Sequence, residues 1–221
     1  MQETAAHHLI LLRHGKTEIN EWNEKNPTAK RIGGQRESPL THEGIEDAVQ
    51  AGKRIATMPY NIVLAVSSDI ERAVMTRDLV LKELEAQNIP VVSIPVLREI
   101  SYGSFEEKTE EEMRREHPEF FENPDFMNWR GDFEQKAPDG ENYADIGERL
   151  KDLEPHLNGE NGEILVVSHL HVSRVLLHRL LGLTKEEACR LKIPNTTPIV
   201  IERGKTNRLI GEVTLQCLLA K

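Results

Sequence analysis

The sequence predicts a three-layer α/β/α sandwich with a mainly parallel sheet and an inserted lid segment. Short apolar runs of strand length alternate with longer segments whose apolar residues recur at helical spacing, as in sheets joined by helical crossovers. One stretch, residues 104–142, is charged and breaks this alternation. The 221 residues suffice for one large domain, so we expect a single domain 1–221 with this stretch as its lid.

Strands are expected where the apolar runs are short. In the first part of the chain and its centre, these runs cover residues 9–12, 62–66, 91–94 and 164–167. Two further runs, 199–201 and 209–218, flank a Gly-Lys-Thr-Asn turn and predict a terminal antiparallel hairpin. Residues 16–38 are polar and are expected to form a loop.

Helices are expected between the strands. Thr41 is placed to cap the first, and Ser68 with Glu71 forms a capping box for the second, which would run toward Gln87. Two later helices are marked by apolar residues, and the second of them should stop at Gly182. Their apolar positions are 146, 150, 153 and 157 in one helix and 172, 175, 176 and 180 in the other.

The lid segment contains three prolines, an aromatic pair and Trp129. Thr109 and Glu112 predict a short capped helix that ends at His117, because Pro118 follows. The segment is too short and too polar for a core of its own, so we expect it to lie beside the sheet.

The composition indicates an acidic globular protein. Hydrophobic residues make up 38% of the chain and charged residues 29%, and the formal net charge at pH 7 is −9. Such a chain lacks the basic face that nucleic acids and anionic membranes require, so neither is expected as a partner. Cys189 and Cys217 lie among apolar residues and are expected to pack rather than to pair.

No apolar run has the length of a membrane span, and residues 1–4 lack the basic and apolar regions of a signal peptide. We therefore expect a cytoplasmic protein. The terminal hairpin would leave a strand at the edge of the sheet, which makes a homodimer one arrangement to consider.

Arg13 and His14 follow the first apolar run and precede Gly15, which lets the chain turn sharply. This places both residues at the carboxyl end of a central strand, where open α/β sheets bind ligands. An arginine beside a histidine suits an anionic substrate, because a fork of donors then adjoins a nucleophile. Taken alone, the pair is better explained by a salt bridge and a loop cap. The rest of the chain reverses that preference.

Further motifs follow residues 12–20 (LRHGKTEIN) along nearly the whole chain. They are 31–35 (RIGGQ), 38–44 (SPLTHEG), 67–76 (SSDIERAVMT), 97–106 (LREISYGSFE), 138–142 (PDGEN) and 166–169 (VVSH). In this order they resemble the motifs of the histidine phosphatase (phosphoglycerate mutase-like) superfamily, over about residues 9–200. The resemblance implies that family's α/β fold and a phosphoryl-transfer reaction.

The resemblance also implies roles for particular residues. Its catalytic set is the nucleophile His14, the proton donor Glu99, and Arg13, Arg72 and His169 around the phosphate. Its further phosphate and substrate contacts are Asn20, Gly34, Tyr102 and Leu170. Arg130, from the lid, is expected to bind a second anionic group of the substrate, unless it pairs with a neighbouring carboxylate instead. Without its motif, Glu99 would be interpreted as a solvated loop charge.

These residue types match phosphoryl transfer. A phosphoryl group in flight spreads negative charge over its oxygens, so catalysis needs positioning and positive charge. Two arginines, an amide and a second histidine supply both without a metal, and no cofactor is expected. His14 would attack through one ring nitrogen while a backbone carbonyl fixes the proton on the other. Glu99 would protonate the leaving oxygen and then activate water.

Three positions leave alternatives. His169 and His171 have the spacing of two metal ligands on a strand, but no further ligand can be placed beside them, so no metal site is expected. Leu170 stands where the superfamily usually has glycine, which could narrow the pocket. Lys16 stands where it usually has glutamate or glutamine, which adds a positive charge near the mouth.

Hydrolysis is the expected reaction. Mutases of the superfamily carry a Trp-Arg-Arg run in the inserted region, whereas here Trp129 and Arg130 are followed by Gly131 and Asp132. We therefore expect a phosphomonoesterase that acts on a small phosphorylated metabolite through a phosphohistidine. Phosphoglycerate mutase-type transfer is the alternative, and a non-catalytic module that binds a phosphorylated ligand is the third. The sequence leaves the substrate open.

Overall fold

A computed structural model describes residues 7–86, 88–123, 126, 129–157 and 162–219. Within these ranges six strands form one sheet, in the order β3-β2-β4-β1-β5-β6. Four strands pair in parallel: β1 (His7–Arg13), β2 (Ile62–Ser67), β3 (Val91–Ser93) and β4 (Glu163–Ser168). The antiparallel hairpin β5 (Ile199–Arg203) and β6 (Arg208–Ile210) completes the sheet on the other side of β1.

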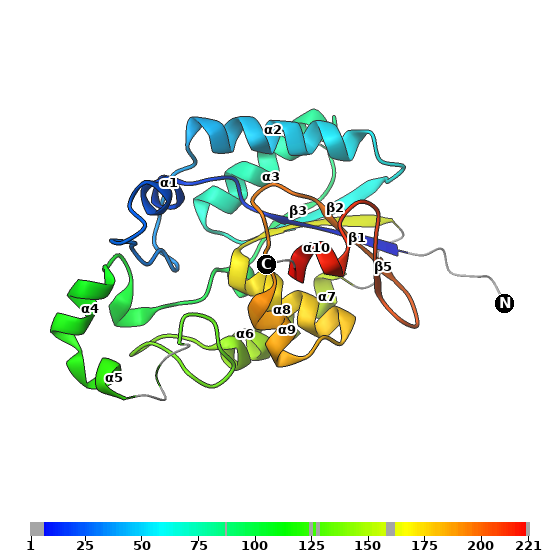
Figure 1. Cartoon of the computed structure of the whole chain (residues 1–221). Coiled ribbons are helices and arrows are strands. Elements are labelled where there is room, and N and C mark those ends of the chain that lie inside the picture. Colours follow the sequence, from blue (N-terminus) through cyan, green and yellow to red (C-terminus); the bar gives the residue numbers. More distant parts are fainter. Residues whose placement is uncertain (1–6, 87, 124–125, 127–128, 158–161, 220–221) are drawn as a thin grey trace.

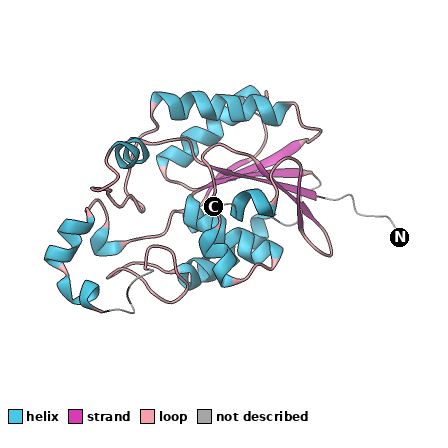
Figure 2. Cartoon of the chain, in the orientation of Figure 1, coloured by secondary structure: helices cyan, strands magenta, loops and turns pink. Residues whose placement is uncertain are grey.

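Helices cover both faces of this sheet, which confirms the predicted α/β/α fold class (Figures 1 and 2). On one face lie α2 (His42–Ala56) and α3 (Glu71–Glu83). On the other lie α6 (Tyr143–Arg149), the 3-10 turn η3 (Leu150–Leu153), α7 (Glu154–Leu157), α8 (Leu170–Leu181), α9 (Lys185–Arg190) and α10 (Leu215–Leu219). The predicted helix over 146–157 is thus α6, η3 and α7 in succession.

The side chains of β1 divide between the two layers, because successive residues of a strand point to opposite faces. Leu9 and Leu11 join the cluster that α8 shares, whereas Ile10 and Leu12 join the cluster that α2 and α3 share. All four are fully buried. The carboxyl end of this strand is therefore held rigidly from both sides.

The structure differs from four local predictions. Helix α1 (Glu18–Lys25) lies within the predicted loop 16–38, capped by Thr17. The Ser68 capping box does not form, because α3 begins after Ile70 and the Ser68 hydroxyl accepts from Ile70 N instead. Helix α3 ends at Glu83, and Gln87 lies outside the described residues. The last strand ends at Ile210 rather than near 218, where α10 stands.

The lid extends from the sheet beside α1 (Figure 1). Its elements are η2 (Gly103–Phe105), α4 (Glu110–Glu116) and α5 (Pro118–Glu122), and η1 (Pro95–Leu97) precedes it. The predicted capping box of Thr109 and Glu112 is present. Phe105, Met113 and Trp129 are buried in the same cluster as the α8 face of the sheet, so the lid shares the core rather than having its own.

Among the described helices none is both long and apolar enough to cross a membrane. Residues 1–6, on which the expectation about a signal peptide depends, lie outside the described residues.

Candidate active site

Polar segments that are far apart in the sequence meet at the carboxyl edge of the parallel strands. Arg13 is opposite Ser168 in the register of β1 and β4, and His14 N donates to Ser168 O at 2.9 Å. His14 and His169, the residues that follow Arg13 and Ser168, therefore lie beside each other at the ends of the two strands, and their ring centroids are 5.0 Å apart. Arg72 enters from the first turn of α3, which follows β2. Sheet topology thus assembles the predicted catalytic histidines beside an arginine.

The ring of His14 is buried and held in one tautomer. Its Nδ1 lies 2.7 Å from Gly15 O, which can only accept, so Nδ1 carries the proton and Nε2 keeps its lone pair. Burial and the charges of Arg72 and Arg13 hold the pKa of His14 well below its ordinary value. A side chain at Gly15 would place its Cβ 2.5 Å from Gly44 O, so the turn after His14 requires glycine.

The two arginines of the site are held by backbone carbonyls. Arg72 donates to Arg36 O at 2.7 Å and to Gly34 O at 2.8 Å. Arg13 donates through one terminal nitrogen to Ile193 O at 2.9 Å. Carbonyls orient a guanidinium without forming an ion pair with it, so within the described residues no salt bridge competes with a ligand for either arginine, and the Glu99 carboxylate acts on both only through space.

Several polar atoms here are buried without a partner among the described residues. They include Arg13 Nε and both ring nitrogens of His169. Burial and the charges of Arg72 and Arg13 hold the pKa of His169 well below its ordinary value. Unpaired buried donors cost free energy unless a ligand satisfies them. An oxyanion with several acceptor oxygens is a ligand of the required kind.

Glu99 lies at the amino end of α8, beside this cluster. Its Oε1 accepts from Ile100 N at 2.9 Å and from His171 N at 3.1 Å, and its Oε2 accepts from Leu170 N at 3.1 Å. His169, the N-cap residue of α8, makes no side-chain hydrogen bond to the first turn of the helix. Glu99 accepts the hydrogen bonds of these amides instead, although it lies 71 positions before Leu170 in the sequence. The backbone amide of Leu170, a predicted substrate contact, is therefore engaged by the carboxylate.

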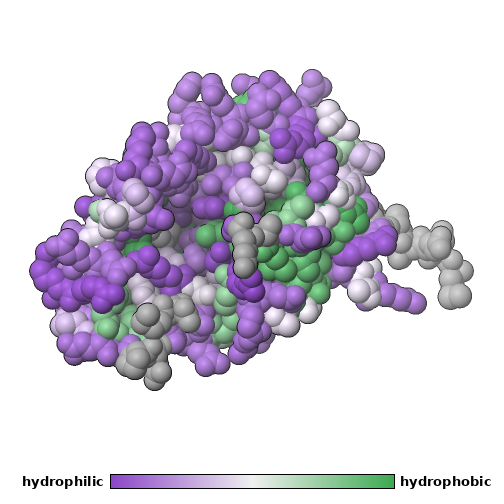
Figure 3. Space-filling view, in the orientation of Figure 1, coloured by the Kyte–Doolittle hydropathy of each residue, from purple (hydrophilic) through white to green (hydrophobic). Residues whose placement is uncertain are grey.

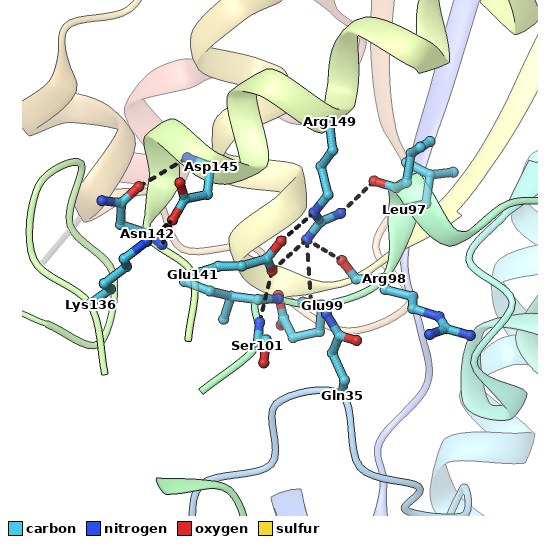
Figure 4. A network of polar contacts seen from close by, with 12 residues as sticks. Gln35, Leu97, Arg98, Glu99, Ser101, Lys136, Glu141, Asn142, Asp145 and Arg149 are labelled. Carbon is cyan, nitrogen blue, oxygen red and sulfur yellow. Dashed lines mark hydrogen bonds and ion pairs between the residues drawn. The ribbon is translucent and has the colours of Figure 1, made fainter. Parts of the chain in front are cut away.

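The backbone around Glu99 is clamped from two sides (Figure 4). Arg149, on α6, donates to Glu99 O at 3.3 Å and to Arg98 O at 2.8 Å, and it also pairs with Glu141 at 2.9 Å. Gln35 donates to Glu99 O at 2.9 Å from the opposite side. These contacts fix the position of the carboxylate against the histidine pair.

A directed chain of hydrogen bonds crosses the floor of the site at His171. Tyr102 Oη donates to Arg130 O at 2.7 Å, so His171 Nε2 must donate to Tyr102 Oη at 3.0 Å. Tyr143 Oη then donates to His171 Nδ1 at 2.8 Å and accepts from Arg174 at 3.1 Å. Burial lowers the pKa of His171 to about 4, which keeps the ring neutral.

His171 has no free nitrogen for a metal in this arrangement. Nor do the described residues contain a group of three or more histidine, cysteine, aspartate or glutamate side chains placed to hold a metal ion.

A cavity of about 450 Å³ opens onto the cluster, and Figure 3 shows the hollow between α1 and the lid. Eight of the predicted site residues line it: Arg13, His14, Asn20, Gly34, Arg72, Glu99, Tyr102 and Leu170. His169 lies against the His14 ring. Asn20 also caps α1, since its Oδ1 accepts from Thr17 N at 3.1 Å. The structure thus brings nine of the ten predicted residues together.

Arg130 is the exception. Its guanidinium lies 3.5 Å from Glu110 and 5.1 Å from the centre of the Trp129 ring, and it lines a separate cavity. Lys16 is also engaged, at 2.6 Å from Glu24 and 2.9 Å from Glu43, and does not line the substrate cavity. The extra positive charge expected near the mouth is therefore paired.

Sequence reasoning missed two groups of residues. Trp22 and its neighbours line the cavity from α1, which was expected to be a loop. The Thr17–Asn20 capping pair was the signal that could have revealed this helix. Arg149 and Tyr143 position other site residues, but nothing in the sequence separates them from ordinary surface helix residues.

Comparison with known proteins agrees with this arrangement. A profile of the histidine phosphatase superfamily (branch 1) matches residues 9–214. The 2,3-bisphosphoglycerate-dependent phosphoglycerate mutase of Parvibaculum lavamentivorans is 30% identical over 200 residues, 88% of this chain and 89% of the mutase. That of Bartonella henselae is 28% identical over 197 residues, 87% and 90% of the two chains. The crystal structure of the alpha-ribazole phosphatase from Shigella flexneri has a TM-score of 0.73 at 26% identity and covers 92% of this chain and 94% of its own.

Proposed function

Because the chain belongs to the histidine phosphatase superfamily, we propose that it is a metal-independent phosphomonoesterase that acts on a small phosphorylated metabolite through a phosphohistidine. The observation that carries the proposal is the cluster at the strand ends. Neutral His14 keeps a free Nε2 next to Arg13, Arg72 and the unpaired nitrogens of His169. This arrangement suits in-line attack on a phosphorus atom whose oxygens are bound by positive and polar donors.

The reaction would proceed in two displacements. In the first, His14 Nε2 forms a bond to phosphorus, the bond to the leaving oxygen breaks, and Glu99 in its protonated form donates a proton to that oxygen. In the second, the Glu99 carboxylate takes a proton from water as the water oxygen bonds to phosphorus and the P–N bond breaks. Inorganic phosphate leaves, and both residues return to their starting states.

Two features of the lid favour hydrolysis over mutase transfer. A mutase must hold a second anionic group while the phosphohistidine waits. Here the charge of Arg130 is already paired with Glu110. At position 131 an added Cβ would lie 2.8 Å from Tyr143 Oη and 3.1 Å from the His171 ring, so the second arginine of the mutase run has no room.

Mutase transfer remains the second candidate because the Parvibaculum and Bartonella proteins are named as mutases. A non-catalytic module that binds a phosphorylated ligand is the third, and the presence of both His14 and Glu99 speaks against it.

Release of phosphate from p-nitrophenyl phosphate by the wild type and by His14→Ala tests the proposal. We expect turnover by the wild type, its loss in His14→Ala, and an acid-labile, base-stable phosphate on the His14 peptide after quenching. His42→Ala, which alters a histidine exposed on α2, is the matched control. Near wild-type turnover by His14→Ala would contradict the mechanism.

Two further assays separate the alternatives. Conversion of 3-phosphoglycerate to 2-phosphoglycerate, primed with 2,3-bisphosphoglycerate, should be slower than phosphate release, and the reverse order would identify a mutase. Dialysis against a chelator should leave activity unchanged. A loss that a divalent cation restores would contradict metal independence.

A further inference from the structure

Helix α1 forms one wall of the substrate cavity. Five of its eight residues line the cavity: Glu18, Ile19, Asn20, Trp22 and Asn23. None of the residues of this helix is buried, so its side chains are turned to the cavity and to solvent rather than to the core. We call the part lined by Trp22, Arg31 and Arg36 the outer cavity, and the part at His14 the inner end.

Trp22 presents an apolar ring to this outer cavity. Its side chain is 46% exposed, and of the large apolar residues that are exposed in the described ranges it alone lines the cavity; Met75 and Val91 do not. An isolated exposed apolar residue needs no explanation, but one at the wall of a substrate cavity is placed to be covered by a ligand.

Two contacts orient the Trp22 ring without burying it. Its Nε1 donates to Ala29 O at 3.4 Å, and the guanidinium of Arg31 lies 6.0 Å from the ring centre. The Asn23 side chain accepts from Arg31 N at 2.8 Å and donates to Arg31 O at 2.9 Å, which ties the following loop to α1. A ring held in this way loses little freedom when a ligand covers it.

The outer cavity has no surplus positive charge. Arg36 lies 3.4 Å from Glu106 and 3.7 Å from Glu107. Arg31 donates to Glu107 O at 2.7 Å and lies 3.9 Å from Glu112. The carboxylates of Glu18 and Glu37 also line the cavity. A second anionic group of a substrate would therefore meet paired arginines and carboxylates.

The volume of about 450 Å³ is far larger than a phosphate needs and lies within the usual range for drug-sized ligands, about 300–1,000 Å³. We propose that the outer cavity binds an uncharged aromatic ring of the leaving group, as in a nucleoside monophosphate, by stacking on Trp22. This rests on the proposed function, which places the phosphate at the inner end. The substrate class is thus a monophosphate ester with a planar, neutral ring and no second anion.

Adenosine 5′-monophosphate and ribose 5-phosphate form the test pair, because both carry a phosphate on the same ribose oxygen and only one has a base. We expect kcat/KM to be about tenfold higher for adenosine 5′-monophosphate, which is the effect of one stacked base. Trp22→Ala should remove most of this preference and leave ribose 5-phosphate within about twofold, while Trp22→Phe should restore much of it. Met75→Ala, an exposed apolar residue outside the cavity, should change neither.

Equal effects of Trp22→Ala on both substrates, or no effect on either, would overturn the inference. So would the absence of any preference in the wild type. Calorimetric titration of the His14→Ala variant with both compounds separates the two proposals. Binding that depends on Trp22 and on the base, without phosphate release by the wild type, would refute the phosphatase and uphold the ring site. Phosphate release without a preference for the base would uphold the phosphatase and refute the ring site.

Discussion

The inner end of the cavity and the lid carry the same kinds of charged side chain but hold them in opposite ways. At the inner end, Arg72 is oriented by two carbonyls and Arg13 keeps an unpaired buried Nε. In the lid, Arg114 and Arg130 both pair with Glu110. A guanidinium that is held by carbonyls meets no opposite charge in its hydrogen bonds, whereas Arg114 and Arg130 share the single negative charge of Glu110, which reduces but does not cancel the charge that each offers to a ligand. Composition cannot show this difference, because both regions contain arginine.

Replacing Arg72 should have the largest effect on this contrast. Arg72→Met removes a buried cation that faces the phosphate, and we expect kcat/KM for p-nitrophenyl phosphate to fall by about 10²–10³-fold, as when one donor to a developing oxyanion is lost. Arg114→Met, its matched control in the lid, should stay within about twofold. A smaller loss for Arg72→Met than for Arg114→Met would reverse our assignment of the two regions. Urea unfolding of each variant separates loss of function from loss of fold.

Glu99→Gln should affect substrates according to their leaving groups. Glycerol phosphate has an alkoxide leaving group that needs a proton, so we expect its turnover to fall by about 100-fold or more. p-Nitrophenyl phosphate has a stable leaving group and should be slowed much less. Glu46→Gln, an exposed carboxylate on α2, is the control. If both substrates slow equally, Glu99 acts in water activation or in positioning rather than as the acid.

The strand edge could be predicted from the sequence for a physical reason. The parallel strands β1, β2 and β4 are buried on both faces, so their apolar runs stand out, and the polar residues that end them must meet at one edge. The motifs around Arg13, Arg72 and His169 then supplied the chemistry. Helices α2 and α8 could also be predicted from the sequence, because each buries one regular apolar face.

The missed features have no such signature. Helix α1 buries none of its residues and has only two large apolar side chains, Ile19 and Trp22, which are too few to reveal a helical period in the sequence. Arg149 is a charged helix residue whose partners, Glu99 O and Arg98 O, are backbone atoms far away in the sequence. The pairing of Arg130 with Glu110 joins two ends of the lid and depends on its tertiary fold. The contacts of Arg149 and Arg130 are long-range and carry no local pattern.

His171 connects the two regions and should make stability depend on pH. Its pKa is about 4 in the folded chain and about 6.5 when unfolded, so only the unfolded chain takes up this proton between those values. The folded pKa is the lower one, so this contribution to stability is full above pH 6.5 and falls as the pH drops toward 4. At 1.36 kcal/mol per pH unit, about 2–3 kcal/mol should be lost by pH 4.5.

Urea unfolding of the wild type and of His171→Gln at pH 7.5 and pH 4.5 measures this loss. The difference in the free energy of unfolding between the two pH values should be smaller in the variant by about 2–3 kcal/mol. Because each protein is compared with itself, any constant cost of the substitution cancels. His42→Gln, which changes an exposed histidine, should show the wild-type difference. Equal pH dependence in His171→Gln would show that the ring is not buried in its neutral form.

The smallest effect is expected from Arg130. The sequence predicts that Arg130→Ala weakens the binding of substrates with a second anionic group, by about 1–3 kcal/mol for one charge-assisted bond. The pairing with Glu110 predicts instead that KM changes by less than about twofold, for 3-phosphoglycerate as well as for glycerol phosphate. Glu110→Ala is the complementary variant, because it removes the carboxylate partner of Arg130 and keeps the guanidinium. Because Arg130 lines a separate cavity, Glu110→Ala should also leave KM for 3-phosphoglycerate within about twofold. A fall in KM that the double variant abolishes would show that the pairing with Glu110, and not the position of Arg130, keeps this arginine from the substrate. A rise in KM for 3-phosphoglycerate in Arg130→Ala would place Arg130 at the substrate after all.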